Sequence, residues 1–227
     1  MGDERGDTRF RARMWAAIQD VFTQILAHPF IAGLTDGTLP RATFASYVIQ
    51  DAHYLVDYAR ALALVGARSP DQQSIAMFSG HARDAIEVER SLNAGLFREM
   101  GISEEAVRST PVMPTTLAYT SYLLRSCQLG SFAEGLAAVL PCYWIYAEVG
   151  AALLARSSPD PLYARWIATY GGEEFAKIVA DVLALVDRVG EVTSAAEQAL
   201  MREHVVTTSR YEWMFWDAAW RREAWPV

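Results

Sequence analysis

The chain has 227 residues, of which 52% are hydrophobic, enough for one large domain with its own core. Its net charge is −7 at pH 7 and it has no basic run, which argues against binding to a nucleic-acid phosphate backbone. Its two cysteines, Cys127 and Cys142, are too few for a disulfide framework, so we expect a reducing, cytoplasmic environment. Residues 1–13 are charged and lack an apolar stretch, so we expect no signal peptide.

Helical periodicity of apolar residues dominates the chain, and proline, glycine or small polar residues mark most breaks between periodic segments. The first segment carries Trp15, Ile18 and Ile25 on one face and stops at a His-Pro pair. Residues 35–40 (TDGTLP) have turn chemistry. In chain order, the expected helices cover 10–27, 41–67, 71–100, a short segment from 103, 115–129, the apolar run 132–155, a segment ending at 169, 173–189 and 194–222.

The absence of strand-like segments defines the predicted fold class. No segment alternates with a period of two, and the chain contains no repeat, low-complexity tract or dividing linker. We therefore predict an all-α fold with a single domain over residues 1–227, of which 1–9 form a flexible N-terminal arm. The run 132–155 is long enough to resemble a transmembrane span, but it contains two glutamates and a proline, so we predict a buried core helix of a soluble protein without membrane contact.

Cys142 directly follows Pro141 within this apolar run. A proline suits the first turn of a helix, where its missing N–H costs nothing. If a helix begins or kinks there, free backbone N–H groups lie near the thiol, lower its pKa and raise the thiolate fraction. Tyr146 lies one turn further along the same face. The alternative for this segment alone is a buried structural cysteine, which most free cysteines are.

Asp51 lies in the second long helix among apolar residues, and Tyr54 shares its face. A buried carboxylate needs partners or takes up a proton, so burial would favour a functional role. The sequence leaves a second arrangement open, in which Asp51 and His53 lie on the solvated side of the helix.

Glu212 lies in the final helix, whose end is apolar nearly all round and is therefore predicted to be buried. Such surroundings disfavour the charged form, so we expect a raised pKa that suits a general acid or base. We expect a phenol such as Tyr170 to hold the carboxyl group in place. The alternative is a rim glutamate at the end of an aromatic core segment. Taken alone, Tyr119 and Tyr170 are typical of core tyrosines with one satisfied hydroxyl.

His81, Asp84 and Glu87 share one face of a predicted helix. Helical bundles build di-iron sites from repeated Glu-x-x-His pairs, but that order is absent here and no second helix supplies the partner ligands. We therefore favour a solvated face over a metal site. Zinc-ligand spacing, a glycine-rich phosphate loop and a G-x-S-x-G element are also absent from the sequence.

Six short blocks, considered together with their order and spacing, are more specific than any single motif. They are 28–30 (HPF), 36–40 (DGTLP), 47–55 (YVIQDAHYL), 140–146 (LPCYWIY), 166–172 (WIATYGG) and 211–216 (YEWMFW). Over nearly its whole length the chain resembles the TenA family, the thiaminase II or aminopyrimidine aminohydrolase proteins. Because it contains Cys142, it resembles the cysteine-containing branch of that family.

The resemblance implies roles for individual residues. Cys142 matches the family's nucleophile, Glu212 matches its acid/base glutamate, and Asp51 matches the aspartate that binds the pyrimidine and helps to position the cysteine. The tyrosines that line the family's pocket match Tyr54, Tyr119, Tyr146 and Tyr170.

The resemblance also implies an all-helical fold of the haem-oxygenase-like type, a homotetramer, and no metal or organic cofactor. The implied reaction belongs to thiamin salvage. In it, 4-amino-5-aminomethyl-2-methylpyrimidine is hydrolysed to 4-amino-5-hydroxymethyl-2-methylpyrimidine and ammonia. Thiaminase II cleavage of thiamin is the implied slower side reaction. The partner implied by the main reaction is a small aminopyrimidine substrate.

Two other classes of protein remain open. A haem-oxygenase-like oxidase or cofactor-biosynthesis enzyme would need metal ligands or a different polar pocket in place of Cys142, and a shared fold does not fix function. A non-catalytic pyrimidine-binding regulatory protein is the second alternative. The acidic charge and the lack of a basic recognition helix argue against direct DNA binding by such a protein.

Overall fold

The computed structural model describes residues 9–227, apart from the side chains of residues 88–94. The predicted arm over 1–9 therefore lies, except for its last residue, outside the described residues. The described part contains helices and no strand, which confirms the all-α prediction. The helices are α1 (Phe10–Leu26), α2 (Pro29–Asp36), α3 (Arg41–Arg68), α4 (Gln72–Met100), α5 (Glu104–Ser109), α6 (Pro114–Leu129), α7 (Phe132–Leu154), α8 (Pro161–Gly171), α9 (Glu173–Val192) and α10 (Ala195–Arg221).

Side-chain caps fix the starts of several helices. Asp71, Ser103 and Ser194 each accept a backbone N–H from the first turn of the helix that follows. At the start of α7, Ser131 Oγ accepts the N–H of Glu134, and the Glu134 carboxylate accepts the N–H of Ser131. This reciprocal pair is a capping box, which satisfies two N–H groups that the helix itself leaves free.

Two features near prolines bear on the predicted helix boundaries. The short helix α2, which was not predicted, follows directly after the predicted end of the first helix, because His28 Nδ1 caps it by accepting the N–H of Phe30 at 3.1 Å. The helix α7 runs through Pro141 without ending, as the prediction of one core helix requires, so no new helix begins at that proline. Proline in a helix interior removes one backbone hydrogen bond and thereby destabilises the helix. Here the helix is buried along most of its length, and its packing offsets that loss.

The predicted stop of α9 at Gly190 is also wrong, because the helix continues to Val192. Gly190 is needed for packing rather than for ending a helix. A Cβ atom at this position would lie 2.2 Å from the Phe10 ring of α1. The glycine therefore lets α1 and α9 approach closely.

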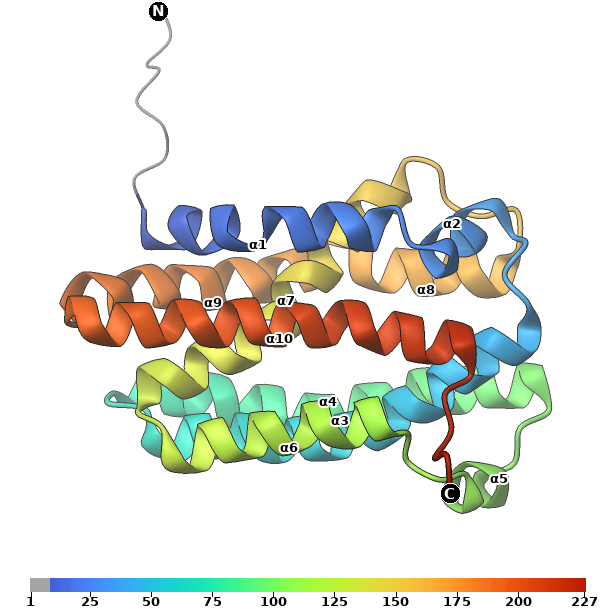
Figure 1. The fold of residues 1–227 in the computed structure, drawn as a ribbon, viewed down its shortest axis with the longest axis horizontal. Helices are drawn as coiled ribbons and strands as arrows, with labels where there is room; N and C mark the ends of the chain where they lie inside the picture. The colour runs from blue at the N-terminus through green and yellow to red at the C-terminus, as the bar shows by residue number, and fades with distance from the viewer. Residues whose placement is uncertain (1–8) are drawn as a thin grey trace, which may run out of the picture.

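The helix α7 lies at the centre of the fold. Figure 1 shows it crossing diagonally between α1, α9 and α10 on one side and α3, α4 and α6 on the other, and it packs against α3, α6, α8, α9 and α10. It is long and apolar enough to cross a membrane, yet 72% of its apolar stretch is buried inside the protein. The predicted core helix is confirmed, and residues on α7 can meet side chains from many other elements.

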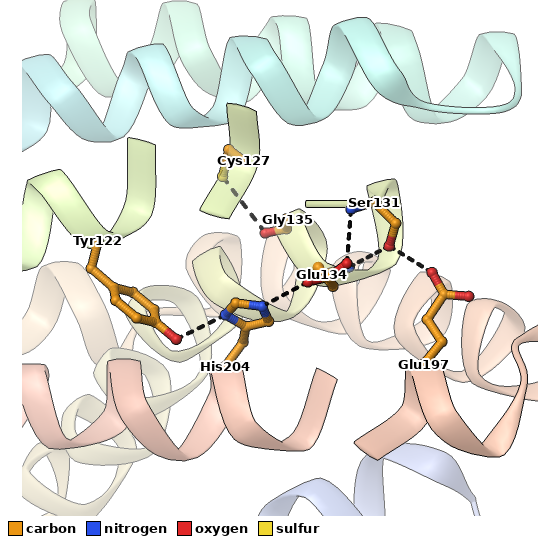
Figure 2. Close-up of polar contacts among 7 residues, drawn as sticks. All are labelled: Tyr122, Cys127, Ser131, Glu134, Gly135, Glu197 and His204. Carbon is orange, nitrogen blue, oxygen red and sulfur yellow. Dashed lines mark hydrogen bonds and ion pairs between the residues drawn. The ribbon is translucent and has the colours of Figure 1, made fainter. Parts of the chain in front are cut away.

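A network of polar contacts joins the beginning of α7 to α6 and α10 (Figure 2). Tyr122 Oη lies 2.9 Å from His204 Nδ1, and His204 Nε2 lies 3.2 Å from Glu134 Oε2. Ser131 Oγ donates to Glu197 Oε1 at 2.6 Å. These contacts connect the turn between α6 and α7 to the first half of α10. They therefore oppose sliding of α7 along α10.

Candidate active site

A cavity of about 270 Å³ opens beside the middle of α7. Its walls come from α3, α4, α7, α8 and the start of α9. The lining is largely aromatic and aliphatic, with a few polar groups, which is the usual composition of a small-molecule site. The lining residues are Asp51, Tyr54, Leu55, Tyr58, Leu62, His81, Asp84, Ala85, Cys142, Tyr143, Tyr146, Thr169, Tyr170, Glu174, Phe175 and Ile178.

Cys142 lines this cavity and is half-buried. Burial, and then the nearby charge of Glu212, raise the pKa of the thiol well above its usual range. The predicted lowering of this pKa is therefore wrong. The physical reason is that Cys142 lies in the interior of a continuous α7, so no helix N-terminus directs free N–H groups at the sulfur.

Two tyrosine hydroxyls partly offset the effect of burial. Tyr54 and Tyr58 lie near the sulfur and favour its ionised form. Tyr58 also donates to the carbonyl of Val139 at 3.1 Å, whereas the buried Tyr54 hydroxyl has no partner at ordinary hydrogen-bond distance and angle. Burying a hydroxyl without a hydrogen-bond partner costs free energy. A ligand or a thiolate that accepts a hydrogen bond from Tyr54 would remove this cost.

Asp51 lies on the buried side of α3 and is 6% exposed. It lines the cavity, and its negative charge adds to the raised pKa of the Cys142 thiol. The alternative of a solvated Asp51 is therefore wrong. His53 faces a different direction, with Nε2 3.1 Å from the carbonyl oxygen of Thr110.

Glu212 is 2% exposed, so the alternative of a rim glutamate is wrong. Burial raises its pKa to about 8, even though a hydrogen bond from Tyr119 acts in the opposite direction. The predicted rise in the pKa of Glu212 is thus confirmed. At pH 7 the Glu212 carboxyl group is therefore protonated in most molecules. Neither Glu212 nor Tyr119 is among the residues that line the cavity, but the charge of Glu212 contributes to the raised pKa of the Cys142 thiol.

The residue that holds Glu212 is Tyr119, whose hydroxyl donates to Oε1 at 2.6 Å. A phenol therefore holds the carboxyl group, as expected. Tyr170, the tyrosine named as an example, lines the cavity and packs its ring against Tyr146, with ring centroids 4.9 Å apart. Tyr119 lies behind the cavity wall, where its ring packs on that of Tyr54 at 5.1 Å.

The other tyrosines indicated by the sequence lie where a flat ligand would contact them. Tyr54, Tyr146 and Tyr170 all line the cavity. Tyr146 Oη lies 3.1 Å from Tyr47 Oη, which fixes its orientation. Aromatic walls of this kind suit a planar heterocycle.

Sequence reasoning missed part of the cavity wall. His81 and Asp84 line the cavity, so the predicted solvated face is only partly right: the Asp84 side chain is still 45% exposed, and Glu87 is exposed as expected. His81 Nδ1 lies 3.0 Å from Tyr143 Oη. Among the described residues no group of three or more histidines, cysteines or carboxylates could hold a metal ion. The shared helical face of His81 and Asp84 was the available signal, but periodicity does not distinguish a cavity from solvent.

Residues 15–222 match the model of the protein family described as TENA/THI-4/PQQC. The chain belongs to this family. The resemblance to TenA proteins drawn from the six sequence blocks is therefore confirmed.

Relatives and solved structures agree with the family assignment. The chain is 39% identical over 198 residues to the aminopyrimidine aminohydrolase of Bacillus subtilis, covering 87% of this chain and 84% of that protein. A TenA homologue from P. horikoshii superposes with a TM-score of 0.88 at 29% identity, covering 94% of this chain and 99% of the other. A Shewanella denitrificans domain described as having a heme oxygenase-like fold superposes at 0.73 with 20% identity, covering 93% and 92%. The haem-oxygenase-like fold is thus confirmed.

Proposed function

We propose that this TenA-family chain hydrolyses 4-amino-5-aminomethyl-2-methylpyrimidine to the hydroxymethyl compound and ammonia, in cytoplasmic thiamin salvage. Cleavage of thiamin is the slower side reaction. The observation that carries the proposal is a thiol and a buried carboxylate in the wall of one cavity, those of Cys142 and Asp51. The buried, protonated carboxyl group of Glu212 acts electrostatically on the same thiol. The name of the Bacillus subtilis relative supports the same reaction.

The first step is addition of the Cys142 thiolate to the electron-poor ring carbon beside N1. Charge develops on N1 as the C–S bond forms, and protonated Glu212 delivers a proton to that nitrogen. Tyr119 holds the carboxyl group for this transfer through its 2.6 Å hydrogen bond. Asp51 accepts from the ring amino group and thereby orients the pyrimidine.

The second step exchanges the substituent on the exocyclic methylene. Electrons released from N1 pass through C5 and expel the amine, which takes up a proton and leaves as ammonia. Water then adds to the methylene, and the thiolate leaves the ring carbon. The net change is one water consumed and one ammonia released per pyrimidine. Measurement of ammonia release from the aminomethyl-pyrimidine by the purified chain tests the proposal, and no release above that of a heat-denatured sample would refute it.

Ligand choice separates the enzyme from a DNA-binding regulatory protein. We expect aminomethyl- and hydroxymethyl-pyrimidine to raise the unfolding temperature. A ligand at a hundred times its dissociation constant stabilises the fold by about 2.7 kcal/mol. Duplex DNA at physiological salt should cause no shift, because the chain is acidic. Thermal-shift titration measures both, and a response to DNA without a response to the pyrimidines would contradict the proposal.

We propose that the chain assembles as a homotetramer. On α10, Leu200, Met214 and Trp220 are exposed, as are Leu129 and Val192 at the ends of α6 and α9. Apolar side chains left exposed on a single subunit are typical of surfaces that become interfaces. Light scattering at micromolar concentration should give four times the mass of one chain, and a monomeric mass would contradict the prediction.

A further inference from the structure

The thiol of Cys142 must lose a proton before it can act as a nucleophile, and the proton needs an acceptor. Among the described residues, the cavity is lined by one imidazole, that of His81, and by the carboxylates of Asp51, Asp84 and Glu174. A carboxylate is ordinarily a much weaker base than an imidazole. Glu212 is occupied, because it keeps its own proton for the pyrimidine ring. The inference rests on the proposed function, since it concerns the same thiol.

His81 on α4 is the one histidine among the described residues that line this cavity. Its Nδ1 lies 3.0 Å from the hydroxyl of Tyr143, with ring centroids 5.5 Å apart. Burial lowers the pKa of His81, while the carboxylates of Asp84 on α4 and Asp181 on α9 act in the opposite direction. The imidazole is therefore neutral at pH 7, and one ring nitrogen can accept a proton.

Tyr58 connects this pair to the thiol. Its ring centroid lies 5.9 Å from that of Tyr143. Its hydroxyl lies close enough to favour the ionised forms of both Tyr143 and Cys142, although it now donates to the Val139 carbonyl.

We propose that His81 takes up the proton of the Cys142 thiol through two intervening tyrosine hydroxyls. The S–H bond breaks and its proton passes to the Tyr58 oxygen. Tyr58 gives its own proton to Tyr143, and Tyr143 gives its own to His81 Nδ1. Both phenols end neutral, and the products are a thiolate and an imidazolium.

The imidazolium is formed between the carboxylates of Asp84 and Asp181, which favour its positive charge. The thiolate–imidazolium pair is a minor state, because the thiol holds its proton more strongly than imidazole does. Addition of the thiolate to an electrophile removes this minor state and draws the transfer forward. His81 and Tyr143 are thus positioning residues that act on the nucleophile from the mouth of the cavity.

Alkylation of Cys142 by iodoacetamide tests the proposal without any pyrimidine chemistry. The rate is measured between pH 5 and 9 in a Cys127→Ser background. The decisive variant is His81→Gln, which can still accept a hydrogen bond from Tyr143 but takes up no proton. We expect alkylation at pH 7 to slow about tenfold, a modest share of the usual effect of a general base, and the inflection below pH 6.5 to disappear.

Tyr143→Phe should slow alkylation to a similar extent, because it interrupts the same path. The double variant should be no slower than either single variant, as expected for residues that act as a unit. The matched control is His53→Gln, since His53 is hydrogen-bonded to Thr110 outside the cavity and should leave the rate unchanged.

A wild-type rate and pH profile in His81→Gln would overturn the proposal. Slow alkylation in His81→Phe with normal alkylation in His81→Gln would also overturn it, because only the hydrogen bond would then matter. If the histidine variants fail to fold, Tyr143→Phe decides the question alone. Alkylation that depends on His81 in a protein that releases no ammonia would refute the proposed function and leave this inference standing.

Discussion

Replacing Cys142 by serine is expected to reduce ammonia release by about a thousandfold or more, the scale on which loss of a nucleophile abolishes covalent catalysis. A serine hydroxyl has a much higher pKa than a thiol and is a far weaker nucleophile than a thiolate. The variant should fold and bind hydroxymethyl-pyrimidine normally, because serine has nearly the same shape. Steady-state kinetics and a thermal-shift titration measure the two effects separately.

The matched control is Cys127→Ser. Cys127 is 1% exposed, and burial raises the pKa of its thiol to about 12, so it is not a nucleophile at neutral pH. Its Sγ lies 3.9 Å from the carbonyl oxygen of Gly135, away from the cavity. We expect this variant to keep its activity. Full activity in Cys142→Ser would eliminate the covalent mechanism.

Replacing Glu212 by glutamine is expected to lower kcat about a hundredfold or more, the usual contribution of general acid–base catalysis, with little change in pyrimidine binding. Glutamine keeps the shape and can still accept the hydrogen bond from Tyr119, but it cannot deliver a proton to N1. The measurement is kcat and KM for the aminomethyl-pyrimidine. Weak binding with normal kcat would reduce Glu212 to a binding residue and make Asp51 the better candidate for the donor.

The pH dependence provides a second measurement of the same role. The pKa of Glu212 is about 8, so the acid form is present below that pH and is lost as the pH rises through it. Activity that depends on the protonated carboxyl group should therefore fall above pH 8. In Glu212→Gln the remaining activity should lack this decline. Tyr119→Phe removes the hydrogen bond that favours the ionised form, so the decline should move to higher pH.

Most of the fold could be predicted from local patterns in the sequence. Apolar periodicity located the long helices, and small polar residues such as Ser103 and Ser194 located their starts correctly. The prediction was wrong where tertiary packing overrides a local signal. Gly190 was predicted to end a helix, but α9 continues past it and packs tightly on Phe10. Pro141, an ordinary helix breaker, lies inside the buried helix α7, as the predicted core helix over 132–155 required.

The site residues were less uniformly predictable. Asp51, Cys142 and three tyrosines could be placed together because the resemblance supplied their roles, and all of them line one cavity. The sequence could not give the surroundings of the thiol, because its raised pKa depends first on burial and then on Glu212, 70 positions away in the chain (212 − 142). For the same reason His81 could not be recognised, since its partner Tyr143 lies on another helix.

Asp51, Cys142 and Glu212 all lie well inside long helices, on α3, α7 and α10, and none of them lies on a loop. Active-site loops can usually loosen while the rest of an enzyme stays folded. The groups proposed to react can separate here only if a core helix unwinds or shifts, and the contacts between α7 and α10 in Figure 2 oppose such movement. Catalytic geometry and global folding are therefore parts of one cooperative unit. Sequence changes in the connecting turns can accumulate without disturbing the chemistry, whereas core substitutions affect stability and turnover together.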